Sequence, residues 1–493
     1  MPFVTGPLPQ RLKLVHGFGA VAFGVKDSGF SFFLLPFYNL VLGVDASTVG
    51  AALAAALVID ALVDPLIGHL SDRTYTKWGR RLPWLYLAPW PLALVWTMLW
   101  SPPFTGTPGF WDIVALAVGV RLLLSACEVP SVSLVPEITD DYDDRTTLFR
   151  YRFLSGWLGG LLMMVLTFTV FLPTPQSQLQ PEGYASYGLF GAALIALSVI
   201  GSAAAQHRIV AQLPERRPPP FSITGAFAEI FDAFREKAFV IFALGGLAAY
   251  VLQGMTFSIT QYVNLYVWQF SELAFQLYPA VLFLSVVLMF VIVGPLHRRW
   301  GKPKSAALGA LVGLAFYCSP YVFYLAGAWP TVGTTASTAL LYGFLVCANT
   351  ASVVAIISAT SMVAEIVEAF EERTGQRAEG TFYAGNWLVQ KCATGGGILL
   401  TSLIVQSIDL APGTPQAEVA PETVRQLVWL FMLAATVLAS IAAFWLARFP
   451  ISREQHEARV AARRGRPAPP APATADPLDQ AVRADPDPHT ITP

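Results

Sequence analysis

The chain has 493 residues and a formal net charge of −1; 55% of its residues are hydrophobic and only 13% are charged. Soluble globular domains carry about 25% charged residues, so this composition predicts a protein that crosses a membrane many times. The balanced charge, without a basic stripe, argues against nucleic acid as a partner. The four cysteines lie in apolar stretches and fit neither a disulfide framework nor a zinc site.

Apolar stretches of bilayer-spanning length recur along the whole chain, and a spanning helix needs about 20 such residues. Twelve are predicted, roughly at 14–43, 48–70, 83–101, 111–136, 152–172, 185–205, 238–266, 274–296, 305–325, 335–363, 381–408 and 424–447. Lysine and arginine concentrate in the loops that follow even-numbered stretches, such as Arg73 to Arg81 after the second. Because cytoplasmic loops are the basic ones, both termini are predicted to face the cytoplasm.

Two carboxylates, Asp60 and Asp64, interrupt the second apolar stretch. A carboxylate at the centre of a spanning helix costs roughly 2.5–3.5 kcal/mol on insertion scales, and such residues usually mark ion pathways. Residues four apart lie on one face of a helix, so the pair can share one cation or one proton. Two nearby carboxylates also repel each other, which favours protonation of one of them. The alternative is a pair bound to buried lysine or arginine for structure alone.

A duplication is visible in two loops. The motif that starts at Pro136-Glu137-Ile138 returns at Ala364-Glu365-Ile366 with an offset of 228 residues, and each is followed by an acidic pair, arginine and threonine. Parallel repeats of this kind place a substrate site near the membrane midplane, between the halves. The predicted organisation is an all-α membrane protein of two pseudo-symmetric six-helix bundles. Its parts are bundles at 1–206 and 238–450, a linker with an amphipathic helix at 207–237, and a disordered tail at 451–493.

These motifs resemble a known family. The run from Gly68 to Arg73, followed by Gly79-Arg80-Arg81, is similar to the loop 2–3 motif of the major facilitator superfamily. Within that superfamily, the segment from Asp60 to Pro65 resembles the second-helix signature of the glycoside–pentoside–hexuronide:cation symporters, the melibiose permease-like group. Glu128-Val129-Pro130 resembles their fourth helix, and Lys391 falls where they keep a lysine in helix eleven. The resemblance spans roughly residues 11–448.

The resemblance implies a twelve-helix symporter of the bacterial inner membrane that works by alternating access, with no enzymatic activity. Asp60 and Asp64 would form the cation-coupling site, and would be metal ligands if the ion is sodium. Substrate binding is expected at a set of charged side chains in spans one, four, five and eleven, namely Asp27, Arg121, Glu128, Arg152 and Lys391. Lys391 is expected to pair across the halves with Asp60, Asp64 or Glu128.

Structural alternatives stay open for several of these side chains. Arg121 and Glu128 are seven residues apart and could form a structural ion pair. Asp27 could pair with Lys26 or with Arg152, and Arg152 could extend toward the membrane surface. Charged loop residues are expected to form an ion-pair network that stabilises the outward-open state, or a solvated charge run: Asp72, Arg73, Arg80, Arg81, Arg145 and Arg373.

Three departures from the family affect ion and substrate. Val63 replaces an asparagine of sodium-using members and supplies no oxygen, which favours a proton over sodium. The two tryptophans that contact sugar in the family correspond to Val132 and Ile356, both aliphatic. A sugar or glycoside is the predicted substrate, and a lysolipid-like amphiphile is the alternative, since sodium-dependent lysolipid symporters belong to the wider family. The expected partners are this substrate, H⁺ or Na⁺, and membrane lipid, with no cofactor and a monomeric state.

Overall fold

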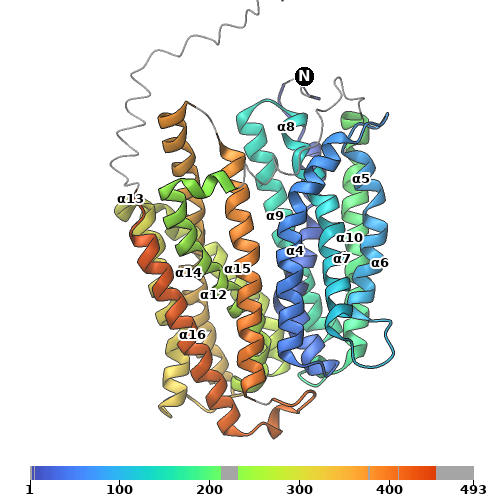
Figure 1. Ribbon diagram of the computed structural model, residues 1–493. Coiled ribbons are helices and arrows are strands. Elements are labelled where there is room, and N and C mark those ends of the chain that lie inside the picture. The colour runs from blue at the N-terminus through green and yellow to red at the C-terminus, as the bar shows by residue number, and fades with distance from the viewer. Residues whose placement is uncertain (1–2, 5, 212–230, 376–377, 409, 451–493) are drawn as a thin grey trace, which may run out of the picture. The chain divides into compact units, whose positions relative to one another are not determined.

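The computed structural model describes residues 3–4, 6–211, 231–375, 378–408 and 410–450, and the regular elements in these ranges are helices (Figure 1). Most of the predicted linker at 207–237, including its amphipathic stretch up to residue 230, and the whole predicted tail at 451–493 lie outside the described residues. The helix of the sixth span ends at Val210, beyond the end predicted for that span at residue 205.

The first half of the chain contains short helices in the first and third spans and long helices elsewhere. Its elements are α1 (Gln10–Phe18), α2 (Val21–Ser28), η1 (Gly29–Phe33), α3 (Leu34–Pro36), η2 (Phe37–Val41), α4 (Ala46–Arg73), α5 (Leu82–Leu87), α6 (Pro89–Trp100), α7 (Phe110–Ser133), α8 (Val135–Ile138), α9 (Tyr142–Leu166), η3 (Thr167–Phe171), η4 (Ser177–Leu179) and α10 (Pro181–Val210). The second half contains η5 (Ala233–Arg235), α12 (Lys237–Tyr262), η6 (Val263–Val267), α13 (Glu272–Leu325), α14 (Thr335–Thr374), α15 (Glu379–Ser407), η7 (Gln416–Glu418) and α16 (Pro421–Ala447).

Ten helical stretches among the described residues are long and apolar enough to cross a membrane. One of them, α13, contains both the predicted eighth span and the predicted ninth span. The two spans are separated at Gly301, where the backbone leaves the helical region (φ 74°). The predicted third span is divided between α5 and α6, each of which begins with a proline at its first or second position. The twelve predicted spans are therefore all present, and the protein is an all-α membrane protein with the major facilitator fold.

The first span is less regular than a single helix over 14–43. It is broken after α1 and again by the π-helical segments η1 and η2, in which the hydrogen bonds skip one residue more than in an α-helix. At Gly29 an added Cβ would lie 2.8 Å from the Trp96 ring, so the backbone there follows the aromatic packing of α6.

Close packing of α2 on α9 depends on glycine. A Cβ built on Gly24 would lie 1.7 Å from the Gly156 carbonyl oxygen, which means that the two backbones touch without an intervening side chain. Small residues permit this approach between membrane helices. The contact constrains the spacing between two predicted site residues: Asp27 lies three residues after Gly24, and Arg152 lies one turn before Gly156.

Gly24→Val should strongly destabilise the protein, because the branched side chain overlaps the α9 backbone rather than a flexible side chain. Overpacking of this kind costs about 1–3 kcal/mol, which should lower the thermal unfolding temperature of the purified protein in detergent. Gly343→Ala is the matched control, since a Cβ there meets nothing within 4 Å. Equal unfolding temperatures for the Gly24→Val variant and the wild type would contradict the described α2–α9 packing.

Neutral polar contacts join the two halves at the lower end of the molecule in Figure 1. The Tyr262 hydroxyl in α12 donates to the Asn39 side-chain oxygen in η2 at 2.9 Å, and the Gln261 amide donates to Gln178 in η4. All four side chains are buried. Phe168 and Phe275 stack nearby, with ring centroids 5.2 Å apart. These lower-end contacts close that side of the interface between the halves.

Candidate functional site

A charged cluster joins α4, α7 and α15 in the interior of the molecule. The Lys391 ammonium lies 2.8 Å from Asp60 Oδ2 and also forms an ion pair with Asp64. The Arg121 guanidinium donates from Nε to Asp60 Oδ2 at 3.2 Å. The Ser125 hydroxyl lies 2.7 Å from Asp64 Oδ1 and 3.2 Å from Asp60 Oδ1, so it can donate to either carboxylate. We call these five residues the central cluster.

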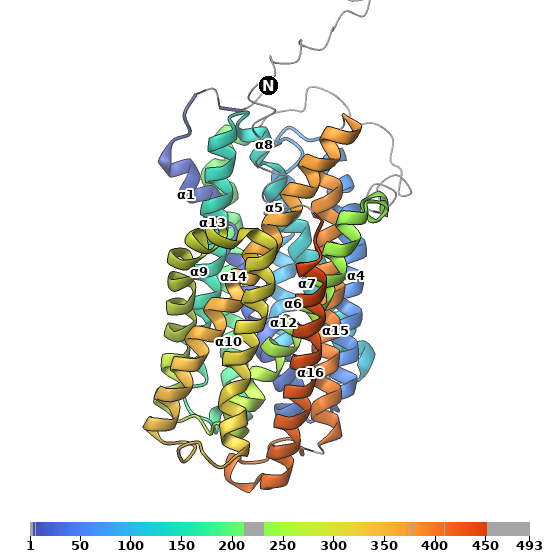
Figure 2. The same ribbon diagram turned by 90° about the vertical axis from the view of Figure 1, so that its left-hand side faces the viewer.

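Small residues bring α4 and α15 close enough for this contact. A Cβ on Gly50 would lie 1.9 Å from the Ser402 hydroxyl, and one on Gly395 would lie 3.2 Å from Ala54. Both views show the two helices side by side (Figures 1 and 2). The two helices run in opposite directions. Lys391 lies one turn before Gly395 on α15 and is therefore next to the two aspartates of α4.

The structure brings four of the predicted site residues together and resolves one alternative. Arg121 pairs with Asp60 and not with Glu128, so the structural ion pair within α7 is not the arrangement found. Seven helical residues span about 10 Å along the axis, too far for an easy direct contact, whereas α4 packs against α7 directly. Ser125 was not among the predicted residues. Its position four after Arg121 and three before Glu128, on the same helical face, is the signal that could have identified it.

The other predicted substrate residues lie on α2, α7 and α9. Arg152 is buried rather than extended toward the membrane surface, and its guanidinium donates to the Ser131 hydroxyl at 2.6 Å. Arg152, Ser131 and Glu128 line one small cavity. Asp27 pairs with the buried Lys26 at 3.6 Å, which is one of the two partners considered for it, and its own side chain is 55% exposed.

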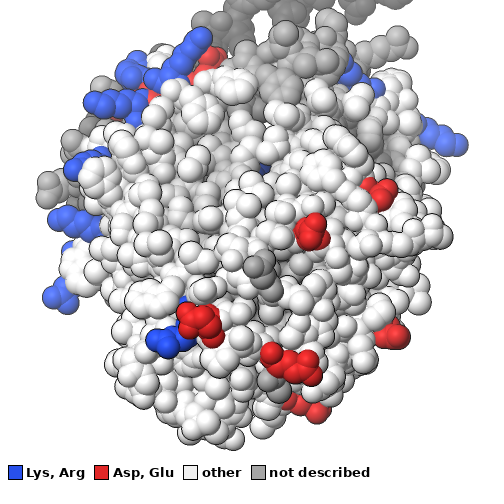
Figure 3. Space-filling view, turned by 60° about the horizontal axis from the view of Figure 1, so that its bottom comes forward, with Lys and Arg blue, Asp and Glu red and all other residues white. Residues whose placement is uncertain are grey.

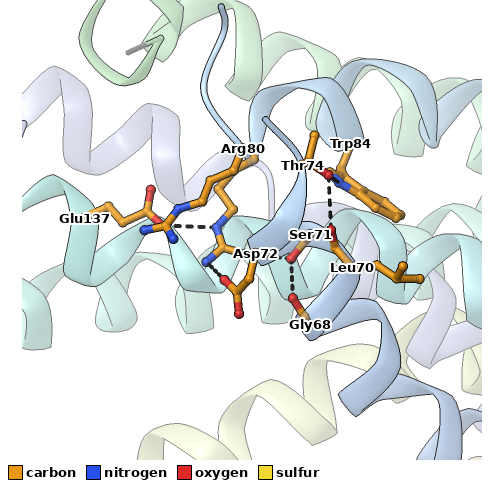
Figure 4. A network of polar contacts seen from close by, with 9 residues as sticks. Gly68, Leu70, Ser71, Asp72, Thr74, Arg80, Trp84 and Glu137 are labelled. Atoms are coloured by element: carbon orange, nitrogen blue, oxygen red, sulfur yellow. Dashed lines mark hydrogen bonds and ion pairs between the residues drawn. The ribbon is translucent and has the colours of Figure 1, made fainter. Parts of the chain in front are cut away.

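A second polar network lies at the upper end of the molecule, around the loop between α4 and α5 (Figure 4). Arg81 donates to Glu137 at 3.1 Å and to the Ser71 hydroxyl at 2.6 Å, and it also pairs with Asp72. Arg80 reaches the same Glu137 carboxylate at 3.1 Å. These groups all belong to the first half of the chain, so the network joins α4, the following loop and α8. Arg73, another predicted loop residue, is the last residue of α4.

The duplicated loops repeat this geometry in part. Glu365 in α14 lies 228 residues after Glu137. It pairs at 2.9 Å with Lys302, the residue that directly follows Gly301. Gly79 and Gly301 both have positive φ, 84° and 74°, where glycine is favoured. The arginines of the two repeated loops bind different partners.

Arg145 binds within its own loop, donating to the Thr139 carbonyl at 2.8 Å and to Asp140 at 3.2 Å. Arg373, its counterpart in the repeat, pairs instead with Glu236 at the start of α12. Glu137 and Glu365, which accept these ion pairs from Arg80, Arg81 and Lys302, were not among the predicted site residues, although the repeated motif contained both.

The chain is similar in sequence to known transport proteins. A family model described as MFS/sugar transport protein matches residues 15–453. An uncharacterized symporter of Synechocystis is 27% identical over 523 aligned positions, covering 90% of this chain and 94% of its own length. The isoprimeverose transporter of Lactiplantibacillus pentosus is 30% identical over 162 positions, covering 32% of this chain and 33% of its own length.

Solved structures support the fold. The crystal structure of the nucleoside transporter NupG superposes with a TM-score of 0.61 at 15% identity, covering 90% of this chain and 99% of that chain. At this identity the likeness concerns the fold alone. The family match covers most of the chain, and its members are transporters rather than enzymes. The chain belongs to the MFS/sugar transport protein family.

Proposed function

We propose that this transporter is a cation-coupled symporter that moves a small organic solute, most simply a sugar or glycoside, by alternating access. The observation that carries the proposal is the ion-pair contact of Lys391 with both Asp60 and Asp64, because it joins a carboxylate pair in one half to an ammonium in the other. Intramembrane charges in such an arrangement typically mark ion pathways.

The proposed coupling follows from charge competition. Without an added ion, Lys391 neutralises the carboxylates and holds α15 against α4. A proton or a sodium ion that binds to the carboxylates supplies the same charge, so Lys391 can leave and the halves can separate at this point. The loop between α4 and α5 is then stabilised by Asp72, Arg80, Arg81 and Glu137. The two repeated acidic loops are stabilised by Arg145 in the first half and Arg373 in the second.

The solute is proposed to bind between the halves, near Asp27, Glu128 and Arg152. The Asp27 carboxylate is exposed and can accept hydrogen bonds from hydroxyl groups. Arg152 and Glu128 can supply a donor and an acceptor, and the small cavity that they share lies within the first half. Hydroxyl-rich solutes need such paired donors and acceptors. A relative named as an isoprimeverose transporter supports a saccharide.

An amphiphile of lysolipid type is the second candidate. It is favoured by the aliphatic side chains at Val132 and Ile356, which offer no ring face for stacking on a sugar. The same charged groups would then bind the polar head group of the amphiphile, and the apolar helix faces would contact its hydrocarbon tail. The two candidates differ in the solute and share the coupling site.

The proposed location is a bacterial inner membrane, with both termini in the cytoplasm and the protein acting as a monomer. The lower face in Figure 3 carries few charges, most of them acidic, whereas the basic loop residues described above lie at the opposite end. This asymmetry supports the orientation, because basic residues remain on the cytoplasmic side.

Uptake into proteoliposomes tests the function directly. Glycosides and lysolipids are offered separately under an imposed proton gradient and an imposed sodium gradient. We expect accumulation of a glycoside under the proton gradient, with alkalinisation of the outer medium in the absence of sodium. Accumulation of a lysolipid alone would replace the sugar proposal with the amphiphile, and strict dependence on sodium would contradict the inference drawn from Val63.

A further inference from the structure

The central cluster is electrically balanced without any added ion. Two carboxylates, Asp60 and Asp64, face two cationic side chains: Arg121 pairs with Asp60, and Lys391 pairs with both aspartates. A single positive ion can therefore enter only if one resident cation leaves. Which of the two cations leaves decides how many carboxylate oxygens become available to the incoming ion.

Arg121 and Lys391 differ in how firmly they are held. Arg121 belongs to α7, in the same half of the chain as Asp60, and its side chain is only 7% exposed. Its guanidinium also lies 5.1 Å from the Phe30 ring centroid, a cation–π contact within that half. Lys391 belongs to α15 in the other half, and its side chain is 25% exposed. A motion that separates the halves withdraws Lys391 and leaves Arg121 in place.

The two carboxylates are consequently not equivalent. Asp60 is 5% exposed and keeps the Arg121 guanidinium on Oδ2, whereas Asp64 is 27% exposed and has Lys391 and Ser125 as its contacts. Sodium needs several oxygen ligands, and an ion shared by both aspartates would lie beside the fixed guanidinium, where like charges repel. Val63, between the two aspartates, offers no side-chain oxygen.

We infer that Arg121 is a specificity-determining residue: a fixed internal counter-ion that withholds Asp60 from the coupling ion and excludes sodium from the carboxylate pair. Asp64 is then the exchangeable carboxylate, and Lys391 is the cation that it exchanges. The inference rests on the proposed coupling role of this cluster and goes beyond it by dividing the work between the two aspartates.

Sodium binding to the purified protein tests the inference without any transported solute. Thermal unfolding is measured in sodium chloride and in choline chloride of equal concentration, for the wild type, Arg121→Gln and Arg121→Lys. We expect no sodium-specific stabilisation of the wild type or of Arg121→Lys, which keeps the charge. Arg121→Gln leaves Asp60 short of one cation, so this variant should gain a saturable, sodium-specific rise in unfolding temperature that the wild type lacks.

The double variant Asp60→Asn/Arg121→Gln provides the matched control, because the gained sodium response should vanish with the Asp60 carboxylate. Saturable sodium-specific stabilisation of the wild type would overturn the inference, and so would a folded Arg121→Gln that gains no response. If Arg121→Gln does not fold, the wild-type titration still decides. Failure to find a transported glycoside would count against the proposed function, but it would not alter these binding measurements.

Discussion

Asp64→Asn should abolish accumulation of the solute against its gradient while leaving the protein folded. The amide keeps the shape of the carboxylate but cannot hold a proton or offer a charge to a cation, so the ion gradient no longer drives the cycle. In proteoliposomes with an imposed ion gradient, the internal solute concentration should reach only that of passive equilibration. The measurement is the steady-state accumulation ratio, with unfolding temperature as the check on folding.

Asp45→Asn is the control for this substitution. Asp45 flanks the same helix at its beginning, is exposed and makes no side-chain cap contact, so its charge is not part of the central cluster. This variant should accumulate solute as the wild type does. Wild-type accumulation by Asp64→Asn would refute the coupling role of the carboxylate pair, whatever the solute.

Lys391→Gln should slow transport severely, because it removes the only cation of the central cluster that comes from the second half of the chain among the described residues. Asp64 loses its ion-pair partner, while Asp60 keeps Arg121. Removing one partner of a buried ion pair costs about 3–5 kcal/mol, and the partial exposure of Lys391 reduces that figure. We expect the initial rate of uptake to fall by at least about tenfold.

Lys391→Arg separates the charge from the side-chain shape. The guanidinium keeps the positive charge but presents it in a planar fork, so partial recovery of the uptake rate is expected relative to Lys391→Gln. If the glutamine variant transports at the wild-type rate, the ammonium is only a structural partner and the competition proposed above does not operate.

Helical spacing and hydropathy were sufficient to predict the spans and part of the central cluster. The four-residue spacing of Asp60 and Asp64 places both on one face, and the cost of an isolated lysine in a membrane predicts that Lys391 finds a carboxylate. The structure has that contact. Such reasoning depends only on the order of residues within each helix and on the need to neutralise each charge.

Contacts that depend on packing between helices could not be predicted in the same way. Sequence spacing suggested Glu128 as a partner for Arg121, but the packing of α7 against α4 places Asp60 closer. The residue type of Ser125 carried no signal, because hydroxyls are common in membrane helices; only its position on the helical face of Arg121 and Glu128 could have identified it. The repeated loops predicted equivalent roles for Arg145 and Arg373, yet the nearest acceptors in the two halves differ.

The lower-end contacts have a consequence for how membrane voltage acts on this protein. Tyr262, Asn39, Gln261 and Gln178 are neutral, so breaking their hydrogen bonds moves no net charge through the electric field. Each such bond contributes about 0.5–1.5 kcal/mol net, which thermal fluctuations can supply. A charge that crosses the full field gains about 2.3 kcal/mol per 100 mV. In the proposed cycle, voltage therefore acts on the displacement of ions and charged side chains at the central cluster, whereas opening of the lower end moves no net charge.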